Sequence, residues 1–187
     1  MRNMTLLVAI LGLLAPSMAL AQSLSFLAIP SSGFTPQNST THFDPPPGSA
    51  ENRGYEGNSS GTARFFGDNE IMFAPVNLPH GSTVISLTCG GRADRLSRRI
   101  VFRLRRNEPQ QANVNMALVS TDFNVTSFQT KSTTSITSPV IDNRRFNYYM
   151  VATIVANGPP ECRTCSVNRC TIAYRLPLPS VGPPVAK

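Results

Sequence analysis

The sequence contains few of the residues on which enzyme sites and aromatic stacking surfaces usually depend. It has no tryptophan, two histidines (His42 and His80) and ten acidic residues. No G-x-S-x-G, HExxH or phosphate-binding loop occurs in it. His80 follows Leu78-Pro79 and precedes Gly81, a turn composition that favours a solvated residue over a general base. These absences favour a non-enzymatic protein with no cofactor.

The acidic residues leave one enzymatic alternative open. Only Asp68 and Glu70 are close in sequence, and their surroundings, Gly67 to Glu70, are typical of a hairpin turn more than of a calcium loop. A carbohydrate-active enzyme would need two carboxylates about 5–10 Å apart in a concave site. The candidates that folding would have to bring together are Asp68, Glu70, Asp122 and Asp142.

The first 21 residues have the pattern of an export signal. Arg2 supplies a positive charge, an apolar stretch runs from Thr5 to Ala15, and Ala19-Leu20-Ala21 matches a small-x-small cleavage site. The apolar stretch, about ten residues long, is too short for a stable transmembrane helix. We therefore expect cleavage after Ala21, a secreted or periplasmic location, and no transmembrane segment in the mature chain.

The remaining composition predicts an all-β fold. Sixteen prolines, 12 glycines and only 14% charged residues disfavour helices, and no segment after the signal has helical periodicity. Short alternating runs separated by turns predict an antiparallel two-sheet sandwich of jelly-roll type with about 8–10 short strands. We expect one domain over residues 22–176, with a flexible loop at about 31–62, and a Pro-rich extended tail at 177–187.

Individual strands follow from local patterns. In the run Thr83–Cys89, alternation places Ile85, Leu87 and Cys89 on the inward face. The strand that follows the arginine-rich run is expected to turn Val114, Met116 and Leu118 inward. The run from Tyr148 to Ala156 is apolar on both faces and predicts a central strand. Further strands are expected at Ser25–Ile29, Ala63–Phe66, Ile71–Phe73, Arg99–Arg105, Phe123–Thr130, Thr133–Thr137 and Cys170–Arg175.

Four cysteines in an exported chain predict two disulfides. Cys89 and Cys170 both fall on the apolar face of a strand, so they can pair if those strands are neighbours; Cys162 would then pair with Cys165. A Cys165–Cys170 bridge is the main competing arrangement. Zinc ligation by Cys162, Cys165 and Cys170 with His80 or Cys89 is a further alternative, as is a redox CxxC, but no second ligand pair supports zinc.

An arginine-rich segment is the feature that suggests a partner. The chain carries 17 basic residues, of which only Lys131 and Lys187 are lysines, and its formal net charge is +7. Arg99, Arg103 and Arg105 should project from one strand face, with Asn113 and Asn115 of the next strand beside them. With Arg106 they form a candidate site for an anionic glycan, lipopolysaccharide or nucleic acid. A merely solvated outer face, or a charged edge that resists aggregation, is the alternative, and few aromatics interleave these arginines.

Three sequence segments carry a resemblance. They resemble a pattern in small exported bacterial β-sandwich proteins. The segments are the opening Ile29 to Pro36, Ala74 to Leu87, which contains Asn77-Leu78-Pro79-His80-Gly81, and Pro139 to Asn143 followed by Tyr148-Tyr149. The resemblance implies a β-sandwich that ends in a strand such as Thr171–Arg175. It implies no active-site residue, and neither the arginine-rich segment nor Cys162–Cys170 belongs to the pattern.

Taken together, these features predict an exported, non-enzymatic binding or surface-structural module. Its partner would be an anionic glycan or another cell-surface component, and the module could also assemble as a homo-oligomer.

Overall fold

The computed structural model describes residues 22–37, 71–93, 97–107, 112–156 and 165–178 in full and the backbone of 54–57 and 63–66. The predicted signal peptide, most of the predicted loop and residues 179–187 of the predicted tail lie outside these ranges. The described residues form eleven strands and one short 3-10 turn, η1 (Ser31–Gly33). The strands are β1 (Leu24–Pro30), β2 (Thr35–Pro36), β3 (Gly54–Gly57), β4 (Ala63–Phe66), β5 (Ile71–Pro75), β6 (Thr83–Arg92), β7 (Arg98–Asn107), β8 (Val114–Ser120), β9 (Gln129–Thr133), β10 (Asn147–Ala156) and β11 (Cys165–Arg175).

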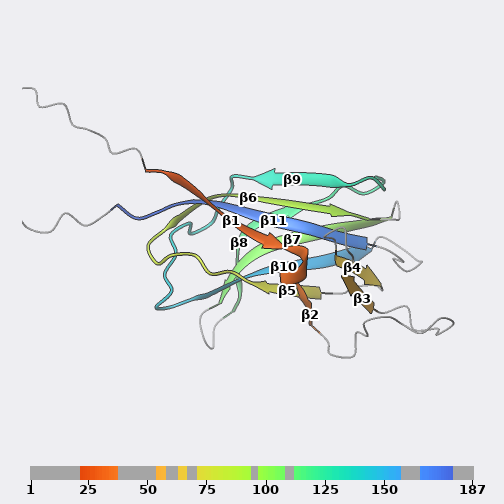
Figure 1. The fold of residues 1–187 in the computed structure, drawn as a ribbon, viewed down its shortest axis with the longest axis horizontal. Helices are drawn as coiled ribbons and strands as arrows, with labels where there is room; N and C mark the ends of the chain where they lie inside the picture. Colours follow the sequence, from red (N-terminus) through yellow and green to blue (C-terminus); the bar gives the residue numbers. More distant parts are fainter. Residues whose placement is uncertain are drawn as a thin grey trace, which may run out of the picture.

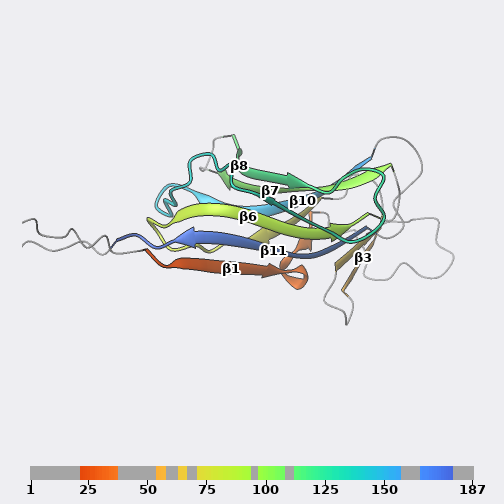
Figure 2. The same ribbon diagram turned by 90° about the horizontal axis from the view of Figure 1, so that it is seen from above.

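The strands form two antiparallel sheets, which confirms the predicted two-sheet sandwich. One sheet has six strands in the order β3-β4-β11-β6-β9, with β1 also paired to β11. The other has five strands in the order β2-β5-β10-β7-β8. Figure 2 shows β1, β11 and β6 side by side in the first sheet. In Figure 1, β1 begins and β11 ends at the same end of the molecule, where Gln22 Nε2 donates a hydrogen bond to the Leu176 carbonyl (3.0 Å).

The core lies between the two sheets, as strand alternation requires. Phe102 and Leu104 of β7 and Met150 of β10 are fully buried, as are Leu87 of β6 and Ile172 of β11. The sheets approach each other closely at Gly91 of β6. A Cβ there would lie 3.0 Å from Ile100 Cδ1 and 3.1 Å from the Ser166 carbonyl oxygen, so only glycine fits without movement.

The prediction for Tyr148–Ala156 is confirmed. β10 occupies the middle of the five-stranded sheet, between β5 and β7. Val151 points away from the core and is still only 2% exposed, while Met150 on the opposite face is completely buried. The outward face of β10 is thus only partly open to solvent, since Tyr149, Thr153 and Val155 are half-buried there, and this burial favours the apolar residues of the run.

Two predicted inward patterns are confirmed only in part because of β-bulges: burial is as predicted at Met116, Leu87 and Cys89, but the rest of each pattern was wrong. In β8, Ala117 pairs with Leu104 but Asn115 pairs with Arg105, so Met116 is an extra residue and the alternation shifts. Ala117 and Val119 therefore join the core, while Val114 and Leu118 are 38% and 49% exposed. In β6, Ser86 pairs with Ala173 and Val84 with Tyr174, so Ile85 is an extra residue and Val84 turns inward in its place.

Two loop assignments also needed correction. The expected loop at 31–62 contains η1, β2 and β3. β2 pairs with β5 and β3 with β4, so both short strands depend on a partner that is contributed by another part of the chain. The expected strand Phe123–Thr130 is mostly a loop, since the strand β9 begins at Gln129, and of Thr133–Thr137 only Thr133 belongs to it.

That loop is closed at its base by side chains. Thr121 Oγ1 accepts a hydrogen bond from the Ile100 amide (2.8 Å), and the Thr121 amide donates to the Ile100 carbonyl (3.0 Å). Lys131 pairs with the Asp122 carboxylate, and Gln129 accepts a hydrogen bond from the Asp122 amide. Asn124 adopts a left-handed conformation (φ 64°), which a strand does not permit.

The structure contains the disulfide Cys89–Cys170. The two residues are direct partners across β6 and β11, so the condition set by the sequence, that these strands be neighbours, is met. Both cysteines are buried. Cys165 is disulfide-bonded too; Cys162, which the sequence pairs with it, lies outside the described residues. This bonding removes the competing Cys165–Cys170 bridge and occupies the sulfur atoms of Cys89 and Cys170 that zinc would need.

Candidate ligand-binding surface

The outer face of the five-stranded sheet carries three of the predicted arginines. Alternation along β7 places Ile100, Phe102 and Leu104 in the core, so Arg99, Arg103 and Arg105 point away from it. Arg98 has the parity of the core residues and is fully buried. A row of arginines on one side of β7 is thus the geometry expected from the sequence.

Arg106 does not join that row. It lies on the other side of β7, where its guanidinium carbon is 4.3 Å from the centre of the Phe146 ring. Arg145 approaches the same ring at 5.2 Å. Arg106 therefore forms a separate cation–π cluster at the end of the strand.

Two of the outward arginines are held in place by neighbouring strands. Arg105 Nε donates a hydrogen bond to Asn115 Oδ1 (2.7 Å), the β8 residue directly opposite it. Arg103 Nη1 donates to Thr153 Oγ1 of β10 (3.4 Å). Asn115 takes the place that the sequence predicted, whereas Asn113 precedes β8 and is exposed. The third arginine, Arg99, lies over the ring of Phe123 at 4.7 Å.

Aromatic side chains reach the same face from strands that are distant in sequence. Tyr149 of β10 is the direct partner of Arg105, and alternation turns it outward because Tyr148 and Met150 belong to the core. Phe73 of β5 lies next to it, with the ring centres 5.9 Å apart and the planes tilted by 49°. Both rings are half-buried. Neither ring is close to the arginines in sequence; β10 and β5 bring them there through the sheet, so proximity along the chain could not reveal them.

We call Arg99, Arg103, Arg105, Asn115, Thr153, Tyr149 and Phe73 the arginine face. Within the described part of the chain, no carboxylate lies within ion-pair distance of its arginines. Burial lowers the pKa of the Arg103 guanidinium from its usual range, and the positive charges of Arg105 and Arg99 lower it further. An anion bound to this face would be favourable, because its charge would offset the mutual repulsion of the guanidinium groups and its oxygens would replace part of their lost hydration.

The apolar part of this face is covered at two positions and open at a third, Leu118 of β8, which is the direct partner of Arg103 and is 49% exposed. Val101 of β7 and Val151 of β10 share its orientation, yet they are only 3% and 2% exposed. The arginine face therefore presents to solvent the polar heads of its arginines, part of Leu118 and the exposed parts of two half-buried rings.

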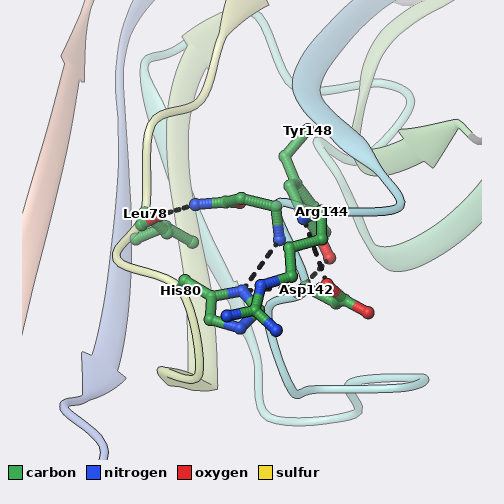
Figure 3. Close-up of polar contacts among 6 residues, drawn as sticks. Leu78, His80, Asp142, Arg144 and Tyr148 are labelled. Atoms are coloured by element: carbon green, nitrogen blue, oxygen red, sulfur yellow. Dashed lines mark hydrogen bonds and ion pairs between the residues drawn. The ribbon is translucent and has the colours of Figure 1, made fainter.

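Segments that carry the sequence resemblance are joined to each other by hydrogen bonds, and we call this contact the brace. Figure 3 shows Leu78 and His80 of one loop against the segment that begins at Asp142. The Asn143 side chain donates to the Leu78 carbonyl (2.8 Å), and the Asn143 amide donates to His80 Nδ1 (3.2 Å). The Tyr148 hydroxyl accepts a hydrogen bond from the Asp142 amide (2.8 Å). Gly81 supplies the required positive φ of 76°.

This brace gives His80 a structural role. Its Nδ1 accepts a backbone hydrogen bond and lies 3.7 Å from Asp142 Oδ1, so the ring orients a loop. Asp122 serves a different loop through Lys131, and Asp68 and Glu70 lie outside the described residues. Over the described ranges, no group of three His, Cys, Asp or Glu side chains is placed to hold a metal ion.

Comparison with known proteins gives structural matches only. No protein-family model and no curated protein matches the sequence. Among solved structures, a xylan-binding module, CBM15, matches with a TM-score of 0.50 and 14% identity, covering 81% of this chain and 97% of the module.

Two further matches have lower TM-scores. The CBM36-1 domain of a multidomain xylanase from the hindgut metagenome of Trinervitermes trinervoides has a TM-score of 0.46 and 10% identity, covering 79% of this chain and 96% of the domain. The C-terminal CBM6 of LamC from Zobellia galactanivorans has a TM-score of 0.45 and 12% identity, covering 79% of this chain and 98% of that one.

At 14% identity, the match to CBM15 establishes the fold alone. The chain is a β-sandwich of the kind found in carbohydrate-binding modules, which agrees with the fold that the sequence resemblance implied. Within the described ranges, no helix has the length and apolar character needed to cross a membrane.

Proposed function

We propose that this protein is an exported, non-enzymatic binding module that holds an acidic polysaccharide on its arginine face. The observation that carries the proposal is the row of Arg99, Arg103 and Arg105, which have no carboxylate partner among the described residues and stand beside Tyr149 and Phe73. A solvated face would not need its guanidinium groups fixed by side chains of both neighbouring strands, as Arg103 and Arg105 are.

The spacing of the arginines suits an extended polyanion. Residues two apart on a strand are separated by about 6.8 Å, so Arg99 and Arg105 lie about 20 Å apart along β7. A linear chain with a carboxylate or sulfate on successive sugar units presents charges along such a line. Guanidinium groups bind these anions in a planar, two-pronged geometry, which arginine provides and lysine does not.

The two aromatic rings favour a glycan over other polyanions. Phe73 and Tyr149 offer apolar surface beside the charges, and the C–H face of a sugar ring packs against such surface while its acidic group reaches Arg105. The fold supports the same proposal, because the xylan-binding module with a TM-score of 0.50 is a sandwich of this kind that binds a polysaccharide.

Binding of the purified protein to immobilised alginate and polygalacturonate across a salt series tests the proposal. We expect binding that weakens steeply as salt rises and that Arg103→Glu/Arg105→Glu abolishes. The matched control is Arg144→Glu/Arg175→Glu, which makes the same charge change at two exposed arginines outside this face. If both double variants lose binding equally, net charge and not the arginine face is responsible, and the proposal fails.

Two further arms separate the alternatives. Single-stranded DNA and lipopolysaccharide are tested beside the glycans, and binding to either of them with no binding to the acidic glycans would identify a different polyanion as the ligand. If no polyanion binds, the arginines are a solvated face and a surface-structural role is the better account.

A further inference from the structure

The outer face of the six-stranded sheet contains a groove that the arginine face does not explain. It has a volume of about 260 Å³ and is lined by Thr88, Gly90, Phe128, Thr130, Asn168, Arg169 and Thr171. These residues come from β6, β9, β11 and the loop before β9. Only that loop touches the arginine face, through Phe123 against Arg99. We call them the Phe128 groove.

Phe128 is exposed although it is a large apolar residue. It is 46% exposed, and it lies directly on Gly90 of β6, where an added Cβ would be 2.7 Å from its Cζ atom. Glycine at position 90 therefore allows the ring to lie against the sheet, where any side chain would push it away. The ring is held in place while much of its surface stays open to solvent.

The loop that carries Phe128 is fixed at its base. Thr121 exchanges two hydrogen bonds with Ile100, and Asp122 contacts both Gln129 and Lys131. These contacts attach the base of the loop to β7 of one sheet and to β9 of the other, so the two sheets set its path. A binding group held in its bound position loses little conformational entropy when a ligand arrives.

The opposite wall of the groove is built by a bulge in β11. Val167 pairs with Gly91 and Cys170 with Cys89, so Asn168 and Arg169 both stand opposite the single residue Gly90. The Cys89–Cys170 disulfide joins the two strands immediately beside this bulge. From the core side of the sheet, it cross-links the two strands that form the floor of the groove.

We infer that the Phe128 groove is a second ligand site, which takes one ring of a neutral sugar with its C–H face on Phe128. The hydroxyls of Thr130 and Thr171, the Asn168 amide and the Arg169 guanidinium supply donors and acceptors around the ring edge. Pockets for drug-sized ligands have volumes of about 300 Å³ or more. The volume of this groove is just below that value, which suits a single ring of a longer chain. With one cation in the groove, binding depends on hydroxyl contacts and stacking more than on charge.

The test uses NMR titration of the 15N-labelled protein with neutral hexasaccharides of xylose, of β-1,3-linked glucose and of mannose. It is done at high salt, where an anionic ligand of the arginine face would bind weakly. We expect at least one hexasaccharide to shift the amide signals of Gly90, Thr130, Asn168 and Thr171 while the signals of β7 stay unchanged. No shift at millimolar concentration with any of the three overturns the inference, whatever the arginine face does.

Three variants test the role of the ring and of its position. Phe128→Ala should weaken binding about tenfold or more, and Phe26→Ala is the matched control, because Phe26 is another exposed phenylalanine (63%) on the same sheet. Gly90→Ala should weaken binding as well, although it keeps the ring, because the new Cβ displaces it. Equal losses in Phe128→Ala and Phe26→Ala, or full binding by Gly90→Ala, would overturn the inference.

Discussion

Removing the Cys89–Cys170 disulfide with Cys89→Ala/Cys170→Ala should lower the free energy of unfolding by about 4.5 kcal/mol. The value follows from the 81-residue separation between the two cysteines, because in the chain-entropy model a cross-link restricts the unfolded chain more as the enclosed loop grows. For a protein of this size, that loss corresponds to a fall in Tm of about 9–18 °C. Denaturant unfolding followed by circular dichroism gives the free energy, and calorimetry gives Tm.

Two controls separate the cross-link from the packing of the sulfur atoms. Ile172→Val trims a buried side chain of the same strand and should cost only about 1 kcal/mol. Reductant should destabilise the wild type strongly, whereas in the double variant it acts only on the disulfide of Cys165. A double variant within about 1 kcal/mol of the wild type would refute the reasoning, because the unfolded chain would then gain little freedom from losing the bond.

Other predictions concern packing, buried hydrogen bonds and export. Gly91→Ala should cost about 1–3 kcal/mol in denaturant unfolding, because the new Cβ meets Ile100 at 3.0 Å; a neutral result would mean that the sheets separate easily here. Thr121→Val keeps the shape but leaves the buried Ile100 amide without its side-chain acceptor, so a loss of about 1–3 kcal/mol is expected. Tyr148→Phe removes the acceptor of the Asp142 amide, and faster hydrogen exchange at that amide is the result to look for. Mass spectrometry of the exported protein should find Gln22 at the N-terminus, and an intact residue 1–21 segment would contradict the predicted signal peptide.

The fold class could be predicted because its causes are local. Alternation of polar and apolar residues specifies a strand with one buried face, and this applies to β7 and to most of β11. The unbroken apolar run of Tyr148–Ala156 likewise required a position covered on both sides. The pairing of Cys89 with Cys170 could be proposed but not chosen, because it depends on which strands are neighbours.

The errors arose where pairing partners change the local pattern. The bulges in β8 and β6 shift the alternation by one residue, and no residue type in Val114 to Leu118 marks the shift. β2 and β3 are two and four residues long and exist only because β5 and β4 hydrogen-bond to them. Such strands carry too little sequence to be recognised alone.

The sequence by itself determined that β7 presents Arg99, Arg103 and Arg105 on one face, because successive side chains of a strand point to opposite sides. The tertiary structure alone decided what stands beside them. Sheet order places Tyr149 next to Arg105 and Phe73 next to Tyr149, and a bulge, a glycine and a disulfide assemble the Phe128 groove. The physical reason is that a strand's own residues decide which of its faces is apolar, while its lateral neighbours depend on the packing of the whole core.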